Sequence, residues 1–244
     1  LCSLPTVGTA NTFSVEETLA LNPDLVIASV ASQESAMQIA EHSIPVIFVD
    51  LESEELLNQS INMLSVALNC NARCKELQEA RGLAMDNVTN LAKTSTFGSP
   101  KVYFAGNSNM LTTAPKGMFQ ANMIRSAGCT NCGDAIEGSS WQEVDAEQIL
   151  KWNPDYIIVA SDAQYSVEDV LANEKLKDCN AVKNLAVFKL DGSIESLDSP
   201  VPASVYGTFY IYIVTHGNYA SELKNYTHGL RDFYQKFYNF TPQL

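Results

Sequence analysis

Residues 16–28 are Glu-Glu-Thr-Leu-Ala-Leu-Asn-Pro-Asp-Leu-Val-Ile-Ala, and residues 147–159 are Glu-Gln-Ile-Leu-Lys-Trp-Asn-Pro-Asp-Tyr-Ile-Ile-Val. The two segments are identical at six of thirteen positions and lie 131 residues apart, about the size of one small domain. A repeat of this period predicts two similarly built lobes. Small ligands commonly bind in clefts between domains, so the repeat also favours ligand capture as a function.

Each copy predicts a short helix, a tight turn and a buried strand. The residue before proline is disfavoured in helices, and Asn and Asp favour turns, so Asn-Pro-Asp ends the helix. The apolar runs that follow are continuous, as in parallel strands covered on both faces by helices. Strands are expected at residues 25–29, 45–50, 101–105, 156–160 and 186–190, separated by helical patterns such as 32–42, 118–127 and 167–172. This alternation predicts an α/β fold with parallel sheets flanked by helices.

The region between the two copies contains no strand pattern. Helices are expected over residues 54–68 and 72–93, and the second would be about 33 Å long at a rise of about 1.5 Å per residue. Such a helix is a stiff connector. We therefore expect an N-terminal lobe of residues 1–70, a connecting long helix of residues 71–95 and a C-terminal lobe of residues 96–244, whose end is again helical.

The composition excludes two classes of partner. The formal net charge of the 244-residue chain is −13, which argues against nucleic acid, because its phosphates require basic patches. It also argues against a polybasic membrane-surface role. No apolar run reaches the roughly 18–20 residues that cross a bilayer.

Six cysteines are present, and two of them form a Cys-x-x-Cys pair at Cys129 and Cys132. This spacing allows a redox dithiol or half of a metal site, but we favour small buried or incidental thiols. No second Cys or His pair has the spacing of a zinc site. A disulfide pattern does not follow from the sequence.

Five segments together resemble one family. In chain order they are Leu-Pro-Thr-Val-Gly at 4–8, the first copy of Glu-x-x-Leu-x-x-Asn-Pro-Asp at 16–24, Gly-Ser-Ser-Trp-Gln-Glu-Val at 138–144, the second copy at 147–155 and Asp-Ser-Pro-Val-Pro at 198–202. With the long helix between the copies, they resemble the helical-backbone (class III) periplasmic substrate-binding proteins of ABC importers. Those proteins carry ferric siderophores, haem, cobalamin and, in one branch, molybdate or tungstate. Family members usually open with a further strand–helix–strand unit, so we expect a first lobe that lacks this unit.

The resemblance implies partners and a location. One exposed glutamate on each lobe docks onto permease arginines in this family, and the matching positions are Glu16 and Glu195. Carboxylate–guanidinium pairing suits such a contact because the guanidinium fork binds a carboxylate bidentately. An extracytoplasmic location is implied, in the periplasm or at the cell surface as a lipoprotein. Membrane contact is then expected only through the permease or a lipid anchor outside this chain.

Ligands of open α/β sheets bind beyond the carboxyl ends of the strands, which selects the loops after residues 29, 105 and 160. The loop 106–117 is richest in donors, and Lys116 could meet an anionic ligand or be a solvated surface lysine. Trp141 could stack on a ligand or serve only in packing. The full set of candidate ligand-binding residues is Thr9, Asn11, Ser29, Asn107, Thr112, Thr113, Lys116, Ser139, Trp141 and Tyr165.

Bare metal ions need His and carboxylate ligands, and none of the three histidines lies in a predicted cleft loop. We expect no direct metal site and no covalent cofactor, and a ligand that is an iron chelate, a corrinoid or an oxoanion. The leading hypothesis is transport of an iron complex by a binding protein that is not an enzyme. The alternatives are another ligand of the same fold, an enzyme that uses Cys129 and Cys132 or the acidic residues, and a sensory or structural relative that has lost transport.

Overall fold

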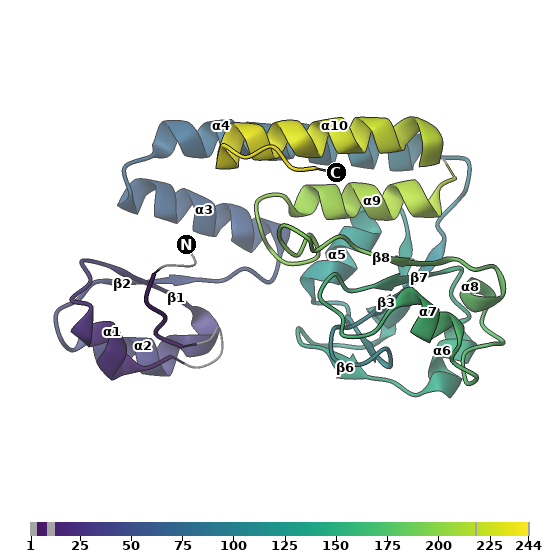
Figure 1. The fold of residues 1–244 in the computed structure, drawn as a ribbon, viewed down its shortest axis with the longest axis horizontal. Helices are drawn as coiled ribbons and strands as arrows, with labels where there is room; N and C mark the ends of the chain where they lie inside the picture. Colours follow the sequence, from purple (N-terminus) through teal and green to yellow (C-terminus); the bar gives the residue numbers. More distant parts are fainter. Residues whose placement is uncertain (1–3, 9–12, 218, 244) are drawn as a thin grey trace. The chain divides into compact units, whose positions relative to one another are not determined.

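The computed structural model describes residues 4–8, 13–217 and 219–243 of the chain. Its contacts divide it into two compact units, residues 1–51 (unit 1) and residues 52–244 (unit 2). Helices flank parallel sheets in both, so the predicted α/β class is confirmed (Figure 1). The division by contacts falls at residue 51 and does not define lobes. The predicted lobe boundaries at residues 70 and 95 therefore stay a prediction.

Unit 1 is built on one copy of the repeat. Its elements are α1 (Val15–Ala20), β1 (Val26–Ser29), a 3-10 turn (Val30–Ser32), α2 (Gln33–Ala40) and β2 (Val46–Val49). The strands β1 and β2 are parallel, with Val26 opposite Val46. Helix α2 contacts both strands and α1. The two strands expected here are therefore confirmed, each shorter than expected by a residue at one or both ends.

Unit 2 opens with two helices, α3 (Glu54–Ala67) and α4 (Asn71–Thr94), which match the expected helices 54–68 and 72–93. Helix α4 packs on α9 (Ser204–Thr215), and α9 packs on α10 (Tyr219–Tyr238), so that these three helices run side by side (Figure 1). Buried Tyr212 and Tyr234 place the predicted C-terminal aromatics in this helical layer.

The larger sheet of unit 2 has four parallel strands in the order β5-β3-β7-β8. They are β5 (Thr130–Asn131), β3 (Lys101–Ala105), β7 (Tyr156–Val159) and β8 (Val187–Lys189). The central strands bury consecutive side chains, among them Tyr103, Phe104, Ile157 and Ile158, as expected of strands covered on both faces. Around them lie α5 (Phe119–Ser126), a 3-10 turn (Cys132–Ala135), α6 (Ala146–Trp152), α7 (Val167–Leu171) and α8 (Asn180–Lys183).

A second sheet of unit 2 was not predicted. The strands β4 (Thr112–Thr113) and β6 (Gln142–Glu143) pair antiparallel and lie at the end of β3, where Gly106 N–H donates to the Thr112 carbonyl oxygen at 2.9 Å. Two-residue strands have no detectable periodicity, so sequence patterns cannot identify them. This small sheet brings the loop 106–117 and the segment 138–144 together.

The repeated Asn-Pro-Asp motif forms the turn that was predicted for it. Asn22 and Asn153 both adopt left-handed backbone angles, with φ values of 49° and 46°. In unit 2, the Asp155 carboxylate accepts a hydrogen bond from the Lys101 N–H at 2.9 Å. The motif therefore ends a helix and fixes the start of the following strand beside its neighbour.

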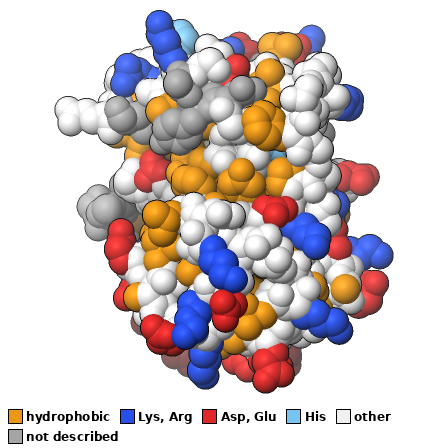
Figure 2. All heavy atoms as spheres, turned by 90° about the vertical axis from the view of Figure 1, so that its right-hand side faces the viewer, with side chains coloured by type: hydrophobic (Ala, Val, Ile, Leu, Met, Phe, Trp, Pro, Cys, Tyr) orange, Lys and Arg blue, Asp and Glu red, His pale blue; other side chains and the backbone are white. Residues whose placement is uncertain are grey.

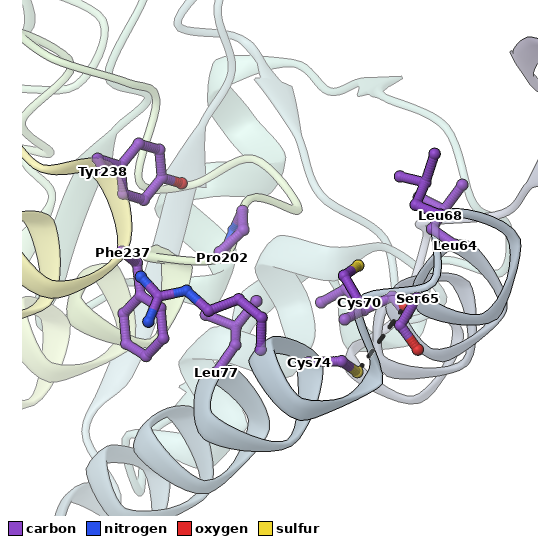
Figure 3. Close-up of a pocket in the computed structure, with 11 residues that line it drawn as sticks. Leu64, Ser65, Leu68, Cys70, Cys74, Leu77, Pro202, Phe237 and Tyr238 are labelled. Carbon is purple, nitrogen blue, oxygen red and sulfur yellow. Dashed lines mark hydrogen bonds between the residues drawn. The ribbon is translucent and has the colours of Figure 1, made fainter.

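A mostly apolar cavity of about 260 Å³ lies among α3, α4 and α10 (Figure 3). Leu64, Leu68, Leu77 and Phe237 contribute to its wall. Beside them the Cys74 thiol donates to the Ile61 carbonyl oxygen at 3.9 Å. None of the residues that line this cavity belongs to a strand end of either unit.

Candidate ligand-binding site

The carboxyl ends of β3 and β7 bring several of the predicted residues together in unit 2. Asn107 follows β3, and its Nδ2 donates to Oδ2 of Asp162, which follows β7, at 3.1 Å. The Tyr165 hydroxyl donates to the Gly106 carbonyl oxygen at 2.6 Å. We call the set Asn107, Thr112, Trp141, Asp162 and Tyr165 the strand-end cluster of unit 2.

Trp141 forms the apolar part of this cluster. Its ring centroid lies 6.0 Å from that of the fully buried Phe104, and the indole itself is only partly buried. Gly106 permits this approach, because a Cβ atom there would lie 2.9 Å from Cε3 of Trp141 and 2.4 Å from Oγ1 of Thr112. Trp141 therefore packs on the strand end while keeping part of its ring accessible.

The two threonines of β4 differ in how they are satisfied. The Thr112 hydroxyl donates to the Asn109 carbonyl oxygen at 2.7 Å. The Thr113 side chain is fully buried, and its Oγ1 has no hydrogen-bond partner among the described residues. Thr113 therefore lies beneath the surface of the cluster and cannot reach a ligand without rearrangement.

Lys116 and Ser139 lie outside the strand-end cluster. The Lys116 ammonium is 3.5 Å from Oε1 of Glu137, and both side chains are exposed. Ser139 is exposed, and it follows Gly138, whose carbonyl oxygen accepts a hydrogen bond from the Gly117 N–H. Lys116 is thus an ion-paired surface lysine in this structure, and its role toward a ligand stays a prediction.

Unit 1 contributes fewer of the predicted residues. Ser29 ends β1, and its hydroxyl accepts a hydrogen bond from the Ala31 N–H at 3.2 Å. It also lines a small pocket of about 310 Å³ with Val7, Phe13 and Thr18. Thr9 and Asn11 lie outside the described residues.

The two glutamates expected to dock a permease differ in their surroundings. Glu16 is exposed in the first turn of α1, which Ser14 caps by accepting from the Glu17 N–H. Glu195 is half-buried, and its Oε2 accepts a hydrogen bond from the Tyr238 hydroxyl at 3.3 Å. Burial raises the pKa of Glu195, and hydrogen bonds from Tyr234 and Tyr238 oppose this rise.

Two aspartates at the end of β7, Asp162 and Asp198, were not among the candidate residues predicted from the sequence. The loop after residue 160 had been selected, but Asp162 in it was not singled out. Asp198 is buried, and its carboxylate accepts hydrogen bonds from the Ser161 N–H, at 3.1 Å, and from the Ser161 hydroxyl. The Asp-Ser-Pro segment therefore fixes the loop at the end of β7, a tertiary contact that no local pattern reveals.

The cysteines of the Cys-x-x-Cys pair are unsuited to redox chemistry. Cys129 and Cys132 are both buried and free. Burial raises the pKa of Cys129 to about 11 and that of Cys132 to about 12. Both remain protonated thiols at neutral pH, whereas a reactive cysteine needs its thiolate form.

Neither a bare-metal site nor a membrane span is found in the described part of the chain. Over those residues, no group of three or more His, Cys, Asp or Glu side chains is arranged to hold a metal ion. No helix built from them combines the length and apolar character needed to cross a bilayer.

Comparison with known proteins identifies the family. The model of the periplasmic binding protein family matches residues 2–194, and the chain belongs to this family. It is 25% identical over 258 residues to the molybdate-binding protein MolA of Haemophilus influenzae, covering 95% of this chain and 71% of MolA. It is 29% identical over 164 residues to the vitamin B12-binding protein of Salmonella paratyphi A, covering 64% of this chain and 59% of that relative.

The solved structures agree on the fold. The structure of molybdate-bound MolA from Haemophilus influenzae superposes with a TM-score of 0.82 at 21% identity, covering 99% of this chain and 80% of MolA. The resemblance to class III substrate-binding proteins of ABC importers is thereby confirmed. The names of the two relatives give different ligands, molybdate and vitamin B12, so the comparisons leave the ligand of this chain open.

Proposed function

We propose that this chain captures an iron complex, such as a ferric siderophore or haem, or a related small ligand, and delivers it to the permease of an ABC importer. The alternatives within the same fold are cobalamin and the oxoanions molybdate and tungstate. Membership of the periplasmic binding protein family supports the binding role and an extracytoplasmic location. A position of the ligand between two lobes, and anchoring as a lipoprotein, remain parts of the proposal.

The observation that carries the proposal is the strand-end cluster of unit 2. Polar side chains from two neighbouring strand ends, Asn107 and Asp162, meet beside the partly accessible ring of Trp141. An apolar surface with a few fixed polar groups is the usual composition of a small-molecule site. The cluster lies at the carboxyl ends of parallel strands, where open α/β sheets bind ligands.

Docking to the permease is assigned to Glu16 and Glu195. Glu16 is exposed and available to a guanidinium partner. Glu195 is half-buried, so docking there would use a carboxylate that Tyr238 already holds in place. Replacing each glutamate by alanine should reduce transport while leaving ligand affinity unchanged, and loss of ligand affinity in either variant would contradict the docking assignment.

The direct test is a fluorescence titration of the two tryptophans against ferric siderophores, haemin, cyanocobalamin, molybdate and tungstate. Trp152 serves as an internal reference, because its carbonyl oxygen accepts a hydrogen bond from Lys101 at the opposite, amino end of β3. Saturable quenching by one ligand, reduced in Trp141→Phe, is the expected result. Folded protein that responds to none of these ligands would favour a relative that has lost transport.

A further inference from the structure

The apolar cavity among α3, α4 and α10 is separate from the strand-end cluster and lies wholly within unit 2 (Figure 3). Its volume of about 260 Å³ is several times the space that one water molecule occupies in the liquid, about 30 Å³. Leu68 in its wall is 57% exposed, so the cavity opens to solvent. The apolar atoms of such a wall gain packing contacts when an apolar group of a ligand enters.

The polar side chains of the wall are turned to partners within the protein. The Ser65 hydroxyl lies 2.8 Å from the Asn62 carbonyl oxygen, and the Cys74 thiol lies 3.4 Å from Oδ1 of Asn62. The Tyr238 hydroxyl donates to Glu195 at 3.3 Å. A polar group that entered the cavity would lose its hydrogen bonds to water and find few replacements. The part of a ligand that lies inside is therefore apolar.

Two cations flank the Phe237 ring, which forms part of this wall. The Arg73 guanidinium carbon lies 4.7 Å from the ring centroid, and the Lys236 ammonium nitrogen lies 5.1 Å from it. Arg73 is the charged residue of the wall, and no carboxylate of the described residues lines the cavity. The apolar interior is thus joined to positive charge at its wall.

Both cations are accessible to an anion. The Arg73 side chain is 48% exposed, and of its five N–H donors one bonds Glu76 at 2.8 Å and another bonds the Lys236 carbonyl oxygen. The pair of Arg73 and Glu76 is exposed to solvent and therefore weak, so a ligand carboxylate can share the guanidinium. Lys236 is exposed, and its ammonium pairs with no carboxylate in the described part of the chain.

This positive charge is a local feature of the surface. The chain carries a formal net charge of −13, and on the face drawn in Figure 2 basic and acidic side chains are interspersed. The molecule as a whole therefore does not attract anions. An anion that binds at the cavity depends on Arg73 and Lys236.

We infer that this cavity is a second binding site, and that its ligand is an alkyl carboxylate, a free fatty acid of medium chain length. The alkyl chain packs against Leu64, Leu77 and Phe237, and the carboxylate pairs with Arg73. The site is independent of the proposed function, because ligand capture at the strand-end cluster uses none of these residues.

The test measures binding of a series of alkyl carboxylates, from hexanoate to dodecanoate, and of the neutral 1-decanol by isothermal titration calorimetry. The protein is the full chain with Cys2→Ser. Affinity should rise about threefold to fourfold with each added CH₂ until the chain fills the cavity. Decanoate should bind more tightly than 1-decanol. Exposed Cys70 lines the cavity and reports occupancy, so decanoate should slow its reaction with Ellman's reagent.

Variants of α4 separate the two parts of the ligand. Arg73→Gln should weaken decanoate binding about twofold to fivefold and leave 1-decanol unaffected, whereas Arg73→Lys should keep part of the preference for the carboxylate. Lys75→Gln is the matched control, since Lys75 is 79% exposed, pairs with Glu79 and does not line the cavity. Leu77→Phe fills part of the cavity and should shift the optimum to a shorter chain.

Three results would overturn the inference. They are the absence of binding of every carboxylate to folded protein, equal affinity of the wild-type cavity for decanoate and 1-decanol, and decanoate binding that leaves the reaction rate of Cys70 unchanged. Equal loss of decanoate affinity in Arg73→Gln and Lys75→Gln would also contradict the role of Arg73. None of these results bears on the proposed function, which the Trp141 titration tests at the strand-end cluster.

Discussion

Asn22 and Asn153 carry the same strained turn in the two copies of the repeat. Each has a positive φ, which costs an ordinary L-residue about 1–2 kcal/mol. Asparagine tolerates this region better than most side chains. The Oδ1 atom of Asn153 also accepts a hydrogen bond from the Asn180 N–H at 2.9 Å. The motif is therefore selected for backbone geometry, and its repetition marks architecture rather than chemistry.

This geometry predicts an order of stabilities at position 153. Asn153→Ala should lower the free energy of unfolding by about 1–2 kcal/mol, because alanine has neither the tolerance for positive φ nor the side-chain acceptor. Asn153→Gly should cost less, because glycine adopts φ 46° without a steric penalty. Denaturant unfolding of the three proteins checks this order, and an alanine variant as stable as the glycine variant would contradict it.

The cysteines provide a second residue-scale prediction. In a Cys2→Ser background, one thiol should react rapidly with Ellman's reagent at neutral pH. That thiol is Cys70, since it is exposed while Cys74, Cys129, Cys132 and Cys179 are buried. Cys70→Ser should remove the fast phase, and denaturation should release the remaining thiols. A fast reaction at Cys129 or Cys132 would contradict the raised pKa values of these groups.

The sequence predicts those site residues that local patterns position, and it does not predict those that contacts between distant segments position. The strand-end rule applied to the sequence located Asn107 and Tyr165, because each follows a strand that hydrophobic runs identify. Lys116 was a candidate because it is a cation in the loop after β3, and its pairing with Glu137 depends on how that loop folds. Asp162 and Asp198 are positioned by contacts between segments that are distant in sequence, which local patterns cannot show.

At the scale of elements, Arg81 joins three parts of unit 2. It is buried on α4, donates to the Val201 carbonyl oxygen at 3.2 Å and to that of Pro202, and pairs with Glu54 at the start of α3. It thus links the helical layer to the loop that follows Asp198. Neither the helix pattern nor the repeat predicted this link, because a charged residue in a helix is usually expected on its solvent face.

Removal of Arg81 should be strongly destabilising. Arg81→Met should lower the free energy of unfolding by about 3 kcal/mol, since it leaves two carbonyl oxygens and a carboxylate without their buried partner. Glu54→Gln should cost less, because the Glu54 side chain is 34% exposed and water can replace part of the pairing. Chemical denaturation measures both. Equal losses in the two variants would show that the salt bridge, rather than the carbonyl contacts, provides the stability.

His216 at the end of α9 predicts a pH dependence. It is fully buried, stacks on Tyr212 at a centroid distance of 4.7 Å, and its Nδ1 lies 2.9 Å from the Thr215 hydroxyl. Burial lowers the pKa of His216 below its ordinary value of 6.5, against hydrogen bonds that raise it. The unfolded chain therefore binds a proton more readily than the folded protein does.

The lowered pKa of His216 in the folded protein makes the protein less stable as the pH falls. The stability contributed by neutral His216 is fully present above pH 6.5 and is lost as the pH falls below 6.5 toward the lowered pKa of the folded state. The free energy of unfolding, measured between pH 7.5 and about 5, should fall less steeply in His216→Gln than in the wild-type protein. His228→Gln, at an exposed position where the imidazole lies 3.2 Å from the Asp232 carboxylate, is measured alongside for comparison. An unchanged slope in His216→Gln would assign the pH dependence to other groups.

At the scale of the whole molecule, the two units differ in how much structure supports the repeated strand. In unit 2 the strand after Asn-Pro-Asp lies between β3 and β8 in a four-stranded sheet, and its residues Ile157 and Ile158 are fully buried. In unit 1 the corresponding β1 pairs with β2 in a two-stranded sheet, and Ile27 is 47% exposed. Two-stranded sheets are marginally stable, and local stability follows the density of buried contacts. The repeat in sequence is therefore expected to produce two strands of unequal stability.

Hydrogen exchange measures this inequality directly. Amides of β1 and β2 in unit 1 should exchange faster than those of β3 and β7 in unit 2, because unit 1 can open locally without disrupting the larger sheet. Peptides that cover residues 26–29 and 46–49 are compared by mass spectrometry with peptides that cover 102–105 and 156–159. Equal protection of the two strand pairs in the unliganded protein would mean that unit 1 opens only with global unfolding.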